Sequence, residues 1–235
     1  MTSIYLIRHG QASFGKENYD ELSELGQKQA THLGSSLARR LPLFDSVYMG
    51  SMKRHKQTAM GCLEQFESSD EIRDAIEIDS DWNEYDHAEI LRVLRPEFET
   101  AASMMAFVKQ QNDPKAFFEL SFNQAIEKWM SGEHDQEYTE TWSDFRGRVH
   151  SALDRVIEMS TGKKSIAVFT SGGPISLLSQ SLLGVDERKL MHMNWTLMNC
   201  GVTKVIRTRT RSFLSSLNEH THFEGAENKH LITYS

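Results

Sequence analysis

The chain reads SIYLIRHGQ from Ser3 to Gln11. The apolar, β-branched run Ser3–Ile7 predicts a buried strand that ends at Arg8. Ligands of open α/β folds bind at the carboxyl edge of parallel strands. At that edge an arginine offers a planar fork of donors for phosphate oxygens, a histidine such as His9 can act as a nucleophile, and Gly10 lets the backbone turn beside a ligand. Taken alone, the motif fits better a histidine that is satisfied at a strand end, with the arginine on the surface.

The rest of the chain alternates predicted strands and helices. Strands are expected at Ser46–Met49 and Ile166–Thr170, a short extended piece at Ala75–Asp79, and a closing strand pair at Val202–Thr208 and Phe213–Leu217. Helices are expected after Ser23, over Lys53–Phe66 and Trp142–Met159, and from Pro174 to Leu183. This alternation predicts a three-layer α/β/α fold with a mostly parallel central sheet.

One segment departs from the alternation. Residues 88–141 contain three stretches with helical spacing and few strand signals, at Ile90–Leu94, Ala101–Gln110 and Phe117–Met130. We therefore expect a single domain over residues 1–235 with a helical insertion, residues 88–141, that caps the pocket and selects the substrate.

Composition narrows the class of protein. The chain has 235 residues, 39% hydrophobic and 25% charged, which is typical of a globular domain, and its net charge of -7 favours neither nucleic acid nor an anionic membrane as a partner. The two cysteines, Cys62 and Cys200, are far apart and fit a reducing compartment. The sequence shows no signal peptide and no run of about 18 apolar residues, so we expect a cytoplasmic protein.

Two more blocks follow the first in order. Leu22–Ala30 reads LSELGQKQA, and Gly50–Ala59 reads GSMKRHKQTA. Together the three blocks resemble the signatures of the histidine phosphatase superfamily, the phosphoglycerate mutase-like proteins. The resemblance implies that His9 is phosphorylated during catalysis and that Arg8 and Arg54 bind the phosphoryl oxygens. Gly10 and Gln11, in the first block, are expected beside the bound phosphate.

The family also carries a glutamate, after its third strand, that gives a proton to the leaving alcohol. Here that region reads DWNEYDH from Asp81 to His87. Glu84 matches the family position, and Asp86 is the nearby alternative. A carboxylic acid close to the phosphate can supply the proton that the leaving group needs.

The chain departs from the family at its second histidine. The family motif is a strand followed by Ser/Thr-His-Gly-Gly, whereas Val168–Ile175 reads VFTSGGPI and places Ser171 where the histidine belongs. The backbone N–H of Gly172 can still bind an anion at the start of the following helix. Either the site is impaired and binds phospholigands only, or another histidine completes it. His87 is the first candidate and is expected to face the pocket; His55 is the weaker one, expected on the surface.

A second departure concerns the substrate. Phosphoglycerate mutases of this family continue with Trp-Asn after the first motif, whereas this chain has Phe14-Gly15. We therefore expect a phosphoric monoester hydrolase of the histidine acid phosphatase type, without metal or cofactor, acting on a small phosphorylated substrate or a phosphoprotein. A phosphoryl mutase and a phospholigand-binding protein are the alternatives. The sequence leaves the oligomeric state open, a homodimer included.

Overall fold

The computed structural model describes residues 1–13 and 20–234. Its contacts divide the chain into two compact units. The first comprises Met1–Glu84 and Val149–Ser235 and contains the sheet, and the second, Tyr85–Arg148, is helical. The residues predicted to carry chemistry lie in the first unit, except His87.

The described residues of the first unit form a six-stranded sheet in the order β3-β2-β4-β1-β5-β6. The strands are β1 (Thr2–Arg8), β2 (Ser46–Met49), β3 (Glu77–Ile78), β4 (Ser165–Thr170), β5 (Val202–Arg207) and β6 (Ser212–Glu219). The first four run parallel, whereas β5 and β6 are antiparallel to their neighbours β1 and β5. The predicted fold class is thus confirmed, and the closing pair forms the antiparallel edge of a mostly parallel sheet.

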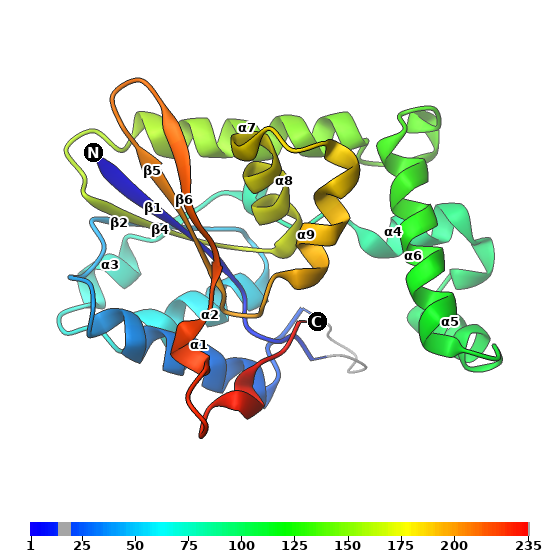
Figure 1. Ribbon diagram of the computed structural model, residues 1–235, viewed down its shortest axis with the longest axis horizontal. Helices are drawn as coiled ribbons and strands as arrows, with labels where there is room; N and C mark the ends of the chain where they lie inside the picture. The colour runs from blue at the N-terminus through cyan, green and yellow to red at the C-terminus, as the bar shows by residue number, and fades with distance from the viewer. Residues whose placement is uncertain (14–19, 235) are drawn as a thin grey trace. The chain divides into compact units, whose positions relative to one another are not determined.

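Helices lie on both faces of this sheet (Figure 1). On one face are α1 (Glu24–Ala38) and α2 (Lys53–Leu63), and on the other is α8 (Gly172–Leu183). The sequence does not predict two short helices, α3 (Asp70–Asp74) and α9 (Leu190–Thr196), because so few turns show no hydrophobic period. Single 3-10 turns occur at Ser80–Trp82, Pro96–Phe98, Asp135–Glu137, Glu187–Lys189, Thr221–Phe223 and Lys229–Leu231.

The core follows the alternation of side chains along the strands. In β1, Tyr5 and Ile7 join the cluster that packs against α1 and α2, while Ile4 and Leu6 point to the opposite face and are also fully buried. Because both faces are covered, the strand reads as a continuous apolar run, as parallel strands do.

The register of β1 against β4 positions the site. Arg8 pairs with Thr170 at the carboxyl ends of the two parallel strands. The next residue of each strand is His9 in one case and Ser171 in the other. Residues more than 150 positions apart in sequence therefore emerge side by side at one edge of the sheet.

The second unit has its own core. Its helices are α4 (His87–Leu94), α5 (Ala101–Lys109), α6 (Pro114–Met130) and the N-terminal part of α7 (Trp142–Glu158). Trp129 packs edge-on against Trp142 at a centroid distance of 5.1 Å and lies 5.6 Å from Phe145. Helices α4, α5 and α6 lie within residues 87–130, and the role of residues 88–141 as an insertion that caps the pocket stays a prediction.

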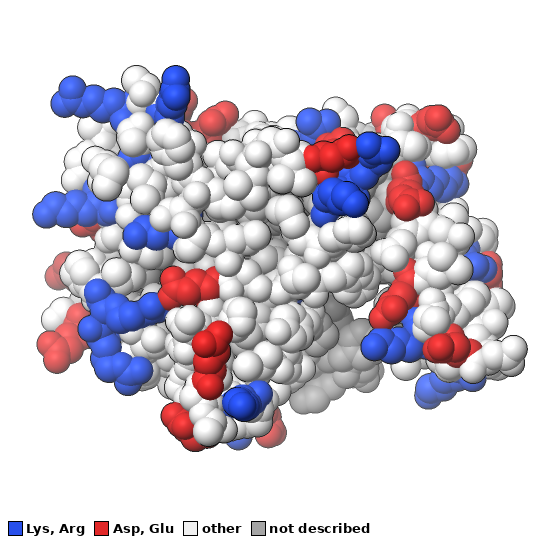
Figure 2. All heavy atoms as spheres, in the orientation of Figure 1, with Lys and Arg blue, Asp and Glu red and all other residues white. Residues whose placement is uncertain are grey.

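On the face shown in Figure 2, lysine and arginine side chains are interspersed with aspartate and glutamate. None of the described helices is long and apolar enough to cross a bilayer.

The close packing of α1 on α2 gives a stability prediction. A Cβ at Gly34 would lie 2.2 Å from the carbonyl oxygen of Cys62, so Gly34→Ala must push the helices apart. We expect the free energy of unfolding to fall by about 1–3 kcal/mol, measured by urea denaturation. Gly147→Ala is the control, since no atom lies within 4 Å of its added Cβ and alanine favours a helix by up to about 1 kcal/mol. Equal effects of the two substitutions would contradict this account.

Candidate active site

His9 follows β1 and is only 6% exposed. Its Nδ1 lies 2.7 Å from the carbonyl oxygen of Gly10. Because a carbonyl can only accept, Nδ1 carries the proton in the neutral ring and Nε2 keeps its lone pair. This is the tautomer that a histidine nucleophile requires.

The peptide around His9 is held from several sides. Its N–H donates to the carbonyl of Thr170 at 2.9 Å, and its own carbonyl accepts from the side-chain amide of Asn199 at 3.1 Å. The N–H of Gly10 donates to the hydroxyl of Thr58 at 3.0 Å. The imidazole is therefore attached to a backbone with little freedom to shift.

Gly10 and Gln11 are placed by α1. A Cβ at Gly10 would lie 2.5 Å from the carbonyl oxygen of Gly26, so only glycine allows this approach. The N–H of Gln11 donates to the Gln29 side chain at 2.8 Å, and its side-chain oxygen accepts from the Ser23 hydroxyl at 2.9 Å. Residues Ser23, Gly26 and Gln29 of the second sequence block thus hold Gly10 and Gln11 of the first block in position.

Two arginines flank His9. Arg8 ends β1, and its Nη1 donates to the carbonyl oxygens of Leu197 and Tyr234. Arg54, in the first turn of α2, is 4% exposed and forms an ion pair with Asp20 at 3.1 Å. Both guanidiniums lie close enough to His9 for their charges to act on it.

Ser171 is the N-cap residue of α8 and is fully buried. Serine in this position usually caps its helix by accepting from a backbone N–H, but no such bond forms here. Its Oγ instead lies 2.7 Å from Nε2 of His55. The expectation that His55 is a surface residue is wrong: it is fully buried in α2, and its ring centroid lies 5.8 Å from that of His9.

Gly50 and Gly172 allow neighbouring polar side chains to approach the backbone of the site closely. A Cβ at Gly50 would lie 2.3 Å from Nδ1 of His55, and one at Gly172 would lie 2.4 Å from Oδ1 of Asn194 and 3.6 Å from Nε of Arg8. Gly172 is therefore beside the arginine with which it was predicted to bind phosphate. The position of a side chain at either glycine is occupied by neighbouring polar groups.

Glu84 reaches the same helix start. Its Oε2 accepts from the N–H of Gly173 at 3.0 Å. The preceding residue, Asn83, is tied to Ser51 by two hydrogen bonds of 2.8 Å, which anchor the Glu84 loop to the segment before α2. A carboxyl group thus lies at the edge where His9 and Ser171 emerge.

The electrostatics keep both histidines neutral. Burial, with the positive charges of Arg54 and Arg8 added, holds the pKa of His9 well below its usual 6.5. Burial and the Arg54 charge do the same to the pKa of His55. A neutral ring is the nucleophilic form, so the arginines prepare His9 as well as a place for an anion.

The structure brings together His9, Arg8, Arg54, Gly10, Gln11, Glu84, Ser171 and Gly172. His87 is the first residue of α4, in the second unit, and its predicted role stays a prediction. Phe14 and Gly15, on which the argument against a mutase rests, lie outside the described residues. Sequence reasoning missed Asn199, which carries no pattern signal because it follows an unpredicted helix.

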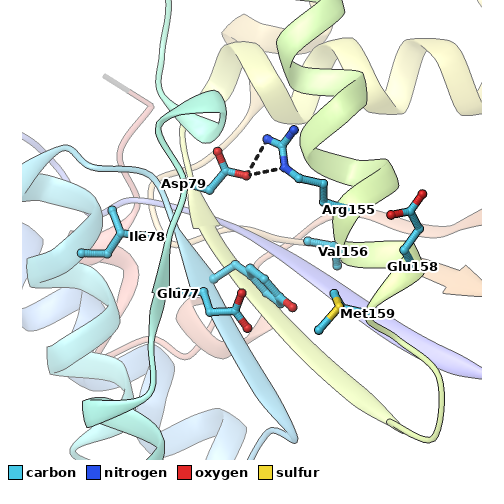
Figure 3. A pocket seen from close by; sticks show the side chains of 8 residues that line it. Glu77, Ile78, Asp79, Arg155, Val156, Glu158 and Met159 are labelled. Carbon is cyan, nitrogen blue, oxygen red and sulfur yellow. Dashed lines mark hydrogen bonds and ion pairs between the residues drawn. The ribbon is translucent and has the colours of Figure 1, made fainter.

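A separate pocket lies at the β3 edge of the sheet (Figure 3). Arg155 there pairs with Asp79 at 2.6 Å and with Asp81 at 2.6 Å. None of the predicted site residues lines this pocket. Within residues 1–13 and 20–234, no group of three or more His, Cys, Asp or Glu side chains is arranged to hold a metal ion.

A sequence model of the histidine phosphatase superfamily (branch 1) matches residues 4–117 and 105–220 of the chain. The chain belongs to this superfamily. No curated protein matches it in sequence.

Solved structures share the fold at low identity. A phosphoglycerate mutase from Bacillus anthracis superposes with a TM-score of 0.64 at 17% identity, over 94% of each chain. A phosphoserine phosphatase from Entamoeba histolytica, in complex with 3-phosphoglyceric acid, gives 0.63 at 20% identity, over 94% of this chain and 99% of that one. The α-ribazole phosphatase of Shigella flexneri gives 0.58 at 18%, over 93% and 96%. The fold thus occurs in mutases and in phosphatases.

The buried neutral histidines predict a pH dependence of stability. Unfolding exposes His9 and His55, which then take up protons with a pKa of about 6.5. The unfolded state binds more protons below that pH, so the free energy of unfolding should fall from pH 6.5 to pH 5 by up to about 1.4 kcal/mol per pH unit for each histidine.

Urea denaturation between pH 7 and pH 5 measures this slope. His55→Gln should reduce it by about one proton. His222→Gln should do the same, because burial lowers the pKa of His222 to about 3. A slope unchanged in both variants would show that these rings are not held neutral.

Proposed function

We propose that the protein is a phosphatase that hydrolyses phosphomonoesters through a phosphohistidine on His9. The observation that carries the proposal is a buried, neutral imidazole with its Nδ1 proton bound by Gly10, set between the charges of two arginines. Membership of the superfamily and its phosphatase folds support it.

In the first step, the Nε2 lone pair of His9 attacks phosphorus and the P–O bond to the alcohol breaks. Glu84, as the carboxylic acid, gives its proton to the departing oxygen. In the second step, water attacks the phosphohistidine, Glu84 takes the water's proton, and the P–N bond breaks to release phosphate and neutral His9. Arg8 and Arg54 bind the charge that spreads over the phosphoryl oxygens in both steps.

Hydrolysis is favoured over a mutase because the Trp-Asn pair of the phosphoglycerate mutases is absent from the sequence. The two activities differ in the fate of the phosphoryl group, which a phosphatase releases to water and a mutase returns to its substrate. A screen of phosphate esters with detection of free phosphate separates them. A protein that only binds phospholigands would release none.

The substrate class is a further part of the proposal. We infer a small phosphorylated compound or a phosphoprotein, in the cytoplasm, with residues 88–141 closing over the phosphate and selecting the group attached to it. Exchange of this segment should change which esters are hydrolysed.

His9→Ala tests the nucleophile. Without an imidazole there is no phosphohistidine, so turnover of p-nitrophenyl phosphate should fall at least a thousandfold while the circular dichroism spectrum is unchanged. Rapid acid-free quenching of the wild type with a ³²P-labelled ester should trap acid-labile label that the variant lacks. A variant with nearly normal turnover would refute the role of His9.

Arg54→Met tests the phosphate clamp. Loss of a charge-assisted contact should raise the Kd of inorganic phosphate at least tenfold, as measured by calorimetry, and Arg8→Met should act similarly. Arg155→Met is the control, because that guanidinium binds Asp79 and Asp81 in the pocket of Figure 3. If all three variants bound phosphate equally well, the anion would lie elsewhere.

A further inference from the structure

The hydrogen bond between Ser171 and His55 is unusual for its position. A serine that starts a helix lowers the free energy of that helix by capping it, by about 1 kcal/mol. Ser171 makes no cap bond and directs its hydroxyl to a histidine 116 positions away in sequence. The carboxylate of Glu84 binds the N–H of Gly173 in its place. Glu84 thus takes the place of the serine cap, and the hydroxyl of Ser171 is directed to His55 instead.

His55 is costly as a purely structural residue. Its ring is fully buried, its neighbour Arg54 disfavours its protonated form, and Gly50 must lack a side chain for the ring to fit. Replacing both members of a buried polar pair by apolar groups is often neutral for stability. Packing alone thus gives no reason for a histidine here.

The surroundings of His55 are those of a phosphate site. Its ring lies 5.8 Å from the ring of His9 between centroids, and its neighbour in sequence is Arg54. Its Nε2 faces the residue that begins α8, beside Gly172. Two imidazoles and two guanidiniums thus converge on one edge of the sheet.

We propose that His55 is a second catalytic histidine, which binds the transferring phosphoryl group through Nε2 and replaces the imidazole that Ser171 lacks. The role rests on the proposed function, and it moves the second histidine from the start of α8 to the first turn of α2. Ser171 is a positioning residue, whose hydroxyl holds Nε2 of His55 in place while the site is empty.

The chemistry suits a group that changes its proton state. In the empty site His55 is neutral, so Nε2 can accept from the Ser171 hydroxyl. A bound phosphate dianion offsets the charge of Arg54, so the ring takes up a proton from solvent, and its Nε2–H then donates to a phosphoryl oxygen instead of accepting from Ser171. No covalent bond to His55 forms at any step, and its proton returns to solvent when phosphate leaves.

The test removes the imidazole at position 55 and then introduces one at position 171. His55→Ala should lower kcat about a hundredfold, as loss of one transition-state donor does, with a smaller change in KM. The double variant His55→Ala, Ser171→His should recover at least tenfold of that loss, because the new ring again offers an imidazole N–H to the phosphoryl group. A purely structural role would not be rescued by a histidine from another helix.

The control is His150→Ala, which removes a histidine–serine hydrogen bond of the same kind, to Ser181 at 3.2 Å, outside the site. Its kcat should stay within threefold of the wild type. His55→Ala at a similar rate, or a folded double variant no faster than the single one, would overturn the proposal. If either variant fails to fold, His55→Gln decides: a loss of tenfold or more supports the role and a smaller loss refutes it.

Binding of inorganic phosphate separates this proposal from the proposed function. Phosphate affinity should fall at least tenfold in His55→Ala and return in the double variant. If the wild type hydrolysed no ester, the phosphatase function would fail, and these affinities would still establish or refute His55 as a phosphate ligand.

Discussion

The parallel pairing of β1 with β4 is the constraint on which the site depends. Because Arg8 and Thr170 are in register at the ends of their strands, His9 and the start of α8 must emerge together. The pairing is itself fixed by the apolar residues of both strands, since a slip of one residue would turn each side chain to the other face. The fold thus determines the distance between the groups before any of them binds a ligand.

Burial and charge act together on the groups so assembled. Arginines near a histidine raise the free energy of its protonated form, and burial adds to that effect, so the rings of His9 and His55 stay neutral in the empty site. The same arginines attract a dianion, which reverses the local field when it arrives. The empty site therefore keeps the nucleophile, His9, unprotonated. The filled site favours a protonated His55 as a second hydrogen-bond donor, so the same residues serve both states.

Much of the fold and of the first motif could be predicted from the sequence, because these features depend on residues that are close together in the chain. Strand β1, Ser23 as the cap of α1, and the glycine at position 26 all follow from short motifs whose physics is local. The burial of His55 could not be predicted in this way. Its neighbours Lys53 and Lys56 suggest a solvated helix, and only the contact with Ser171, between distant parts of the chain, turns the ring inward. Asn199 was missed for the same reason, since its hydrogen bond to His9 is purely tertiary.

A serine in place of a histidine need not mean a lost function, because catalysis depends on where an imidazole lies and not on which segment carries it. The start of α8 and the first turn of α2 both border the same edge of the sheet, so a histidine on either can reach the space beside His9. Once α2 supplies the ring, a histidine at position 171 would compete for its volume, whereas a serine fits and offers a hydroxyl to hold it. Ser171 and His55 are then a matched pair, and reading either position alone would misjudge the site.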